Sequence, residues 1–266
     1  MISDNKNLNL ELPYGYLLSA TPINISGIGT AVSPKLSDLY EDTNLNKYYY
    51  NIAKLIVSGT TEDLLTFVKK TDSNAITFDP YDTDKGVLSK YEILVKTPSL
   101  RDLFKKSLSL FFKNIIVYSN EEKCFLTFKN SELDSLSGII NKNTFPLCCS
   151  VISQLMHAGS GKDKKDENDL SSLPEDAAKA LRAFEKYSKQ KDVSNYKNYQ
   201  IDNIISKMCA AGCGYNLLNI YNLTVWQLYD QFEAYSQCRI SAIAERSFSV
   251  WGGEDFDYET WLKNNN

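Results

Sequence analysis

One stretch of the chain, residues 159–169, carries no apolar side chain and divides the sequence into two parts. It consists of Gly, Ser, Lys, Asp, Glu and Asn only. Such a run buries too little apolar surface to offset the entropy that ordering removes, so we expect a flexible linker. We therefore predict an N-terminal unit at 1–158, a polar linker at 159–171 and a C-terminal helical unit at 172–266.

The composition is that of a folded protein. Of 266 residues, 43% are hydrophobic and 23% are charged, which provides enough apolar material for a sizeable core. The net charge of -4 gives no reason to expect binding to nucleic acid. No apolar stretch reaches the roughly 18–20 residues that cross a bilayer, and the polar N-terminus lacks the apolar core of a signal peptide. We therefore expect a cytoplasmic protein with no membrane partner.

The N-terminal unit combines helical patterns with one β-rich region. We predict an extended arm at 1–32, followed by a short helix that Ser33 caps, with Pro34 in its first position. Two β-rich runs, 115–118 and 124–128, flank a polar turn and predict a hairpin. Capping residues and apolar periodicity predict further helices at 48–57, 60–70 and 97–111. Two more helices are predicted within 131–157, with Pro146 near the start of the second.

The sequence pattern of the C-terminal unit predicts helices. We predict one helix from 172 to about 191 and a second that begins near Ile201 and ends at Gly212 or Gly214. Thr224 and Gln227 have the spacing of a capping box, so a third helix is expected from Val225 to about Arg246. The predicted fold class is mainly α with a small β-hairpin component, in two units joined by the polar linker.

The residues that usually carry chemistry are sparse. A single histidine, His157, excludes metal sites with several imidazole ligands, and we expect it to lie at a helix end. The six cysteines lack the paired spacing of a zinc knuckle and are expected to be free thiols. We therefore predict a protein that is not an enzyme, with no catalytic residue, no cofactor and no metal. A metal-dependent enzyme remains the less favoured alternative, with these acidic residues as its ligands: Glu254, Asp255, Asp257 and Glu259.

Aromatic residues are concentrated towards the end of the chain, where all three tryptophans occur. Trp and Tyr are enriched at binding hot spots, so these rings are candidates for an exposed partner-binding surface. The alternative is that this segment packs on its own domain. The predicted partner-binding residues are Trp226, Tyr229, Phe232, Trp251, Phe256 and Trp261.

Several segments resemble tail-assembly-chaperone-type proteins of tailed bacteriophages that infect low-GC Gram-positive hosts. The resemblance is carried by Asp202-Asn203-Ile204-Ile205, by the run from Tyr215 to Phe232, and by the ending Ser249-Val250-Trp251-Gly252-Gly253 with Trp261-Leu262-Lys263. Earlier pieces are similar to the same family: Ser33 to Tyr40, in which Lys35 departs from the usual Thr, and Leu108 to Phe112 before the hairpin.

The resemblance implies a non-enzymatic chaperone or scaffold in the host cytoplasm. Proteins of this family bind the tape-measure protein or other tail proteins, such as tube or baseplate components, and keep apolar helices in solution while the tail forms. Self-association is a further expectation. The alternative is a structural virion protein of the tail or baseplate, which would remain in the finished particle.

Overall fold

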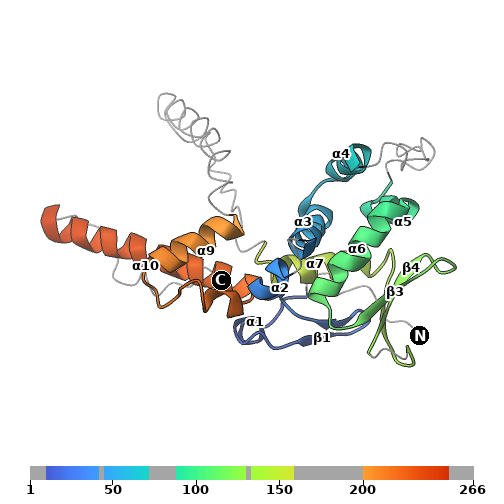
Figure 1. Cartoon of the computed structure of the whole chain (residues 1–266), viewed down its shortest axis with the longest axis horizontal. Helices are drawn as coiled ribbons and strands as arrows, with labels where there is room; N and C mark the ends of the chain where they lie inside the picture. Colours follow the sequence, from blue (N-terminus) through green and yellow to red (C-terminus); the bar gives the residue numbers. More distant parts are fainter. Residues whose placement is uncertain (1–9, 42–44, 72–87, 130–132, 159–199, 252–266) are drawn as a thin grey trace, which may run out of the picture. The chain divides into compact units, whose positions relative to one another are not determined.

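The computed structural model describes residues 10–41, 45–71, 88–129, 133–158 and 200–251 (Figure 1). Over these residues the chain is multi-helical and contains two small antiparallel sheets, of two and three strands. The predicted class, mainly α with a small β component, is therefore confirmed. The predicted linker at 159–171 and the predicted helix at 172–191 lie outside the described residues.

The chain forms two compact units. The first comprises residues 1–159 together with the short segment 221–227, and the second comprises 160–220 together with 228–266. The segment 221–227 is separated in sequence from the rest of the first unit, so long-range contacts must place it there.

The first unit holds seven of the helices that the structure describes and all of the described strands. Its helices are α1 Tyr14–Leu18, α2 Leu36–Tyr40, α3 Leu45–Ser58, α4 Thr61–Thr71, α5 Lys90–Lys96, α6 Pro98–Phe111 and α7 Phe145–Leu155. Its strands are β1 Ile23–Ile25, β2 Gly29–Ala31, β3 Ile115–Ser119, β4 Cys124–Phe128 and β5 Leu136–Ile140. The later elements are α9 Ile201–Ala210, the 3₁₀ turn η2 Ile220–Asn222 and α10 Val225–Trp251.

The helices with local sequence signals form where they were predicted. The Thr60 hydroxyl accepts a hydrogen bond from the backbone N–H of Asp63 at 3.1 Å, and the Asp63 carboxylate accepts one from the Thr60 N–H at 2.8 Å. These reciprocal bonds start α4. Pro98 occupies the first turn of α6. The hairpin β3–β4 is also confirmed, with Ile115 opposite Phe128 and Ser119 opposite Cys124.

Three local predictions are wrong. The segment predicted as an extended arm, 1–32, contains helix α1 at Tyr14–Leu18 in addition to strands β1 and β2. The other two predictions fail because of distant partners. The first half of 131–157 is strand β5 and not a helix, because it pairs with β4 and places Gly138 opposite Thr127. Ser33 does not cap α2, which has Lys35 at its N-cap. The Ser33 hydroxyl is engaged instead with Leu155 and Trp226, far along the sequence.

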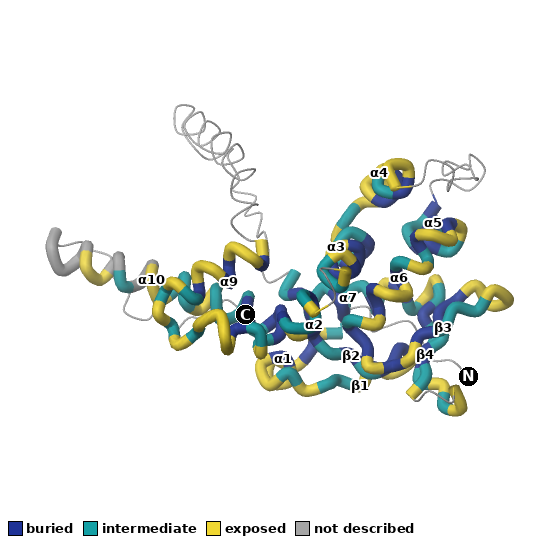
Figure 2. Tube along the Cα trace, viewed as in Figure 1, coloured by how far each residue is buried: buried dark blue, intermediate teal, exposed yellow. Residues whose placement is uncertain are grey.

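The core of the first unit lies where α3 and α6 pack together, above the three-stranded sheet (Figures 1 and 2). Ser107 on α6 donates a buried hydrogen bond to the Tyr49 carbonyl of α3 at 2.8 Å. Phe104, fully buried, makes edge contacts with Phe125 of β4 and Phe145 of α7 at ring-centroid distances of 5.3 and 5.9 Å. The Phe104 ring of α6 therefore packs against both the three-stranded sheet and α7.

The N-terminal arm is fixed to the three-stranded sheet by backbone contact. The N–H of Ile139 donates to the Gly27 carbonyl at 2.9 Å, and the buried Thr127 hydroxyl donates to the Ile28 carbonyl at 2.6 Å. Gly27 and Gly138 form a parallel bridge. A Cβ atom at Gly138 would lie 2.5 Å from the backbone of Gly27, so this approach requires glycine.

None of the described helices is both long enough and apolar enough to cross a membrane.

We expect Gly138→Ala to lower the free energy of unfolding by about 1–3 kcal/mol, because the added methyl group must displace backbone atoms. Chemical denaturation of the purified chain measures this loss. Gly15→Ala is the matched control, since no atom lies within 4 Å of a Cβ built there. Equal stability of the two variants would contradict the close approach of the arm.

Candidate functional site

The predicted partner-binding residue Trp226 is buried, with 5% of its surface exposed. Its ring meets Tyr14 edge-on at a centroid distance of 5.3 Å and lies 5.4 Å from the ring of His157. All three residues belong to the first unit. The expectation that Trp226 is exposed is therefore corrected, because the ring is used in packing the segment 221–227 into the first unit.

The backbone around Trp226 is held by a complete set of hydrogen bonds. The first four N–H groups of an α-helix have no partner inside the helix. In α10, the N–H of Thr224 donates to the Gln227 side chain at 2.8 Å, and the N–H of Gln227 donates to the Thr224 hydroxyl at 3.2 Å. This confirms the predicted capping box.

The other two N–H groups of this turn are satisfied by residues from the start of the chain. Val225 donates to the Pro34 carbonyl at 2.9 Å, and Trp226 donates to the Ser33 hydroxyl at 3.2 Å. That hydroxyl donates in turn to the Leu155 carbonyl at the end of α7, at 2.9 Å. Ser33 therefore connects the end of α7 to residues 225–227, the part of α10 that belongs to the first unit.

The remaining predicted aromatic residues have different positions. Tyr229 and Phe232 lie on α10 in the second unit and are half-buried. Trp251 is the last residue of α10, and its side chain is outside the described part. Phe256 and Trp261 also lie outside the described residues, as do Glu254, Asp255, Asp257 and Glu259.

A pair of exposed leucines in the second unit was missed by the sequence analysis. Leu217 and Leu218 are 65% and 92% exposed. The Asn216 side chain accepts a hydrogen bond from the Leu218 N–H at 2.8 Å, and the Asn219 side chain accepts one from the Asn216 N–H at 2.8 Å. The Asn219 amide also donates to the Gly214 carbonyl at 3.0 Å. The two side chains are thus presented by a loop that its own asparagines hold in shape, which an Asn-Leu-Leu-Asn pattern could have indicated.

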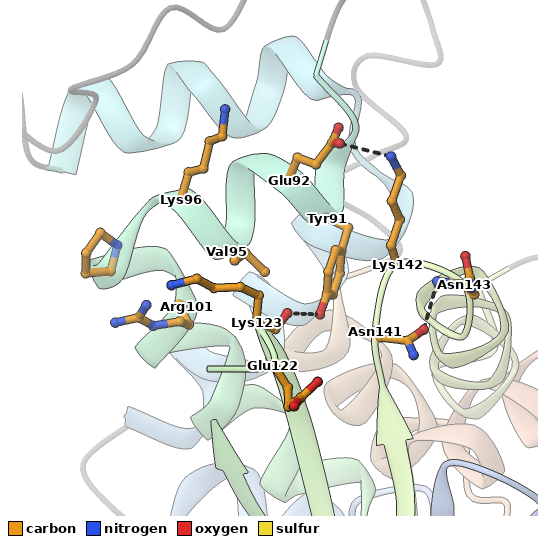
Figure 3. Close-up of a pocket in the computed structure, with 11 residues that line it drawn as sticks. Tyr91, Glu92, Val95, Lys96, Arg101, Glu122, Lys123, Asn141, Lys142 and Asn143 are labelled. Atoms are coloured by element: carbon orange, nitrogen blue, oxygen red, sulfur yellow. Dashed lines mark hydrogen bonds and ion pairs between the residues drawn. The ribbon is translucent and has the colours of Figure 1, made fainter. Parts of the chain in front are cut away.

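A pocket of about 620 Å³ opens on the first unit, within the size range of ligand-binding pockets (Figure 3). Three parts of the fold line it: the corner between α5 and α6, the β3–β4 turn and the loop from β5 to α7. The Tyr91 hydroxyl lies 2.8 Å from the Lys123 carbonyl and 3.1 Å from the Ile140 carbonyl, and it joins the turn to the end of β5. Burial raises the pKa of Tyr91, which keeps the hydroxyl protonated as a donor.

An ion pair closes one side of this pocket. Lys142 donates to the Glu92 carboxylate at 2.9 Å, and the same carboxylate accepts hydrogen bonds from the N–H and hydroxyl of Ser89 at 2.8 Å each. The bond from Lys142, followed by those from Ser89, lowers the pKa of Glu92 to about 2. Glu92 is therefore a fixed anion that caps α5, and it is a poor proton acceptor at neutral pH.

The described residues offer little of the chemistry of an active site. They contain no group of three or more His, Cys, Asp or Glu placed to hold a metal ion. All six cysteines are free thiols, and burial raises the pKa of Cys148 and, to about 12, that of Cys149. A protonated thiol is a weak nucleophile. His157 comes directly after Met156, the C-cap of α7, which confirms its predicted position at a helix end.

One comparison with known proteins gives a match. A family model described as the YomV second domain, a family of phage origin, matches residues 188–266. This segment contains α9, the leucine loop and α10, and it includes the residues that carry the strongest sequence resemblance. The match fits a phage protein. Neither a curated protein nor a solved structure matches the chain.

We expect Ser33→Ala to lower the free energy of unfolding by about 1–3 kcal/mol, because the Trp226 N–H loses its acceptor and the Leu155 carbonyl loses its donor. Denaturant unfolding followed by tryptophan fluorescence measures the change. Ser109→Ala is the control, since its exposed hydroxyl bonds only within α6 to the Lys105 carbonyl. A Ser33 variant as stable as the Ser109 variant would show that this hydroxyl does not hold the segment 221–227 in the first unit.

We expect the stability difference between the wild-type chain and Glu92→Gln to depend on pH. Because the folded pKa of about 2 lies below the ordinary value of 4.5, the contribution of the carboxylate is complete above pH 4.5 and is lost as the pH falls towards 2. The exposed setting limits it to less than about 1 kcal/mol. Unfolding measured across this range tests the trend, and Lys142→Gln should reduce the same pH-dependent difference. A difference that stays constant with pH would contradict the assignment.

Proposed function

We propose that the protein is a non-enzymatic chaperone or scaffold of phage tail assembly, which binds the tape-measure protein or another tail protein in the host cytoplasm. The observation that carries the proposal is the match of 188–266 to a family of phage origin. The matched segment coincides with the residues, 200 to 263, that resemble tail-assembly-chaperone-type proteins.

The leucine loop supports a binding role for this segment. An exposed leucine gains about 1.5–3 kcal/mol when a partner covers it. The loop that carries Leu217 and Leu218 is held by hydrogen bonds from backbone N–H groups to the Asn216 side chain. Because the loop backbone is fixed before a partner binds, little backbone entropy is lost on binding. We therefore place the contact with the tail protein at this loop. The half-buried Tyr229 and Phe232 remain candidates for the same surface.

The test is a pull-down of the tagged chain from cells that produce phage tails, with mass spectrometry of the bound proteins and of purified particles. We expect a large tail protein in the pull-down and no bait in the particles. A bait retained at fixed copy number in particles would support the structural virion alternative instead. Recovery of no tail protein with the bait would contradict the proposal.

Leu217→Asn combined with Leu218→Asn should reduce recovery of the tail protein at least about tenfold, because the variant loses the apolar contact while keeping the loop hydrogen bonds. Leu45→Asn is the matched control, as another exposed leucine in the first unit. Comparable circular dichroism and unfolding curves establish that both variants fold. Unchanged recovery by the double variant would remove the loop from the binding surface.

A further inference from the structure

Charge is distributed unevenly around the pocket of the first unit. Four cations line it, Lys96, Arg101, Lys123 and Lys142, against the two carboxylates Glu92 and Glu122. One carboxylate, Glu92, is already paired with Lys142. Among the described residues, the lining therefore carries an excess of positive charge, although the chain as a whole has a net charge of -4.

Arg101 and Lys123 supply the positive charge that is open to a ligand. The Arg101 guanidinium carbon lies 4.4 Å from the centre of the Tyr118 ring, which is a cation–π distance. Such a contact uses the ring face and leaves N–H groups of the guanidinium for an acceptor. Within the described part of the chain, neither Arg101 nor Lys123 forms an ion pair. Both side chains extend along the same side of the pocket in Figure 3.

The backbone that presents Lys123 is constrained. This residue has a φ of 50°, in the left-handed region, at the turn between β3 and β4. The Tyr91 hydroxyl bonds to its carbonyl and holds the turn against α5. The position of the Lys123 side chain is thus set by the fold before a ligand binds.

The beginning of α6 adds to the positive potential. Pro98, its first residue, lines the pocket, and Thr97 at the N-cap makes no side-chain capping bond. The Thr97 hydroxyl is fully buried and has no hydrogen-bond partner among the described residues. No acidic residue occupies the first turn of α6. An N-terminus without these counter-charges favours an anion nearby.

The rest of the lining suits a peptide better than a nucleotide. Val95 and Pro98 offer apolar surface, and Asn141 keeps its side-chain N–H₂ available because its oxygen accepts from the N–H of Asn143 at 2.9 Å. A base would need a free aromatic face to stack on. The Tyr91 ring is buried against Phe145 at 5.2 Å, and Arg101 covers the Tyr118 ring.

We propose that this pocket binds an acidic peptide segment of a partner protein, with a carboxylate held between Arg101 and Lys123 and an apolar side chain against Val95 and Pro98. This site lies in the first unit, outside the segment that matches the phage family. It is independent of the tail-assembly proposal, and either can fail without the other.

The experiment uses the full chain and a fluorescein-labelled peptide of alternating Glu and Leu, with a twin in which every Glu is Gln. Fluorescence anisotropy should show binding of the Glu peptide that weakens as salt rises, and much weaker binding of the twin. Equal binding of both peptides, or no binding of the Glu peptide, would overturn the proposal. Inorganic phosphate and acetate are compared as competitors of the labelled Glu peptide. If phosphate displaces the peptide at a lower concentration than acetate does, the site is a phosphate site and the peptide assignment is overturned.

Arg101→Gln combined with Lys123→Asn should lower the affinity for the Glu peptide at least about tenfold, because both charge-assisted contacts are lost. Asn tolerates the positive φ at position 123, so the turn is preserved. Lys105→Gln combined with Lys129→Asn changes the net charge equally at exposed positions outside the pocket and should leave binding unchanged. Unfolding curves verify that both variants fold, and equal affinity of the two would overturn the proposal.

Discussion

The first turn of α10 depends on hydrogen-bonding groups that lie far away in sequence, 193 residues in the case of Ser33 and Trp226. Ser33 and Pro34 accept from Trp226 and Val225, and Ser33 is tied in turn to the end of α7. Without these acceptors, two buried N–H groups would have no partner, which is costly in a protein interior. The burial of the Trp226 ring follows from this arrangement, since the backbone bonds place the ring beside Tyr14.

The two candidate binding features share a physical property, although one is apolar and the other is charged. Both are held in shape by hydrogen bonds within the protein. The Asn216 side chain fixes the leucine loop, and the Tyr91 hydroxyl fixes the turn that carries Lys123. Preformed sites lose less entropy on binding, so modest contact areas can give useful affinity.

Sequence patterns predicted the elements whose causes are local. The Thr224–Gln227 box and the Thr60–Asp63 cap involve residues three apart, so inspection of the sequence suffices. Strand β5 and the role of Ser33 depend on partners far away in sequence, which no local pattern encodes. The pocket was missed for the same reason, because three separate segments supply its lining. The exposed leucine pair had a local signal, because asparagines such as the two that flank it are typical of turns.

The insertion of 221–227 into the first unit also determines the order in which the protein can be completed. Ser33 and Trp226 are 193 residues apart, so the residues that surround the Trp226 ring are synthesised long before Trp226 itself. Until Trp226 has been synthesised, the first unit lacks its contacts with Tyr14, His157 and Ser33. Contacts of such high sequence separation form late and slow the completion of a domain. The N-terminal part of this protein therefore reaches its final packing only after residues 221–227 have been made.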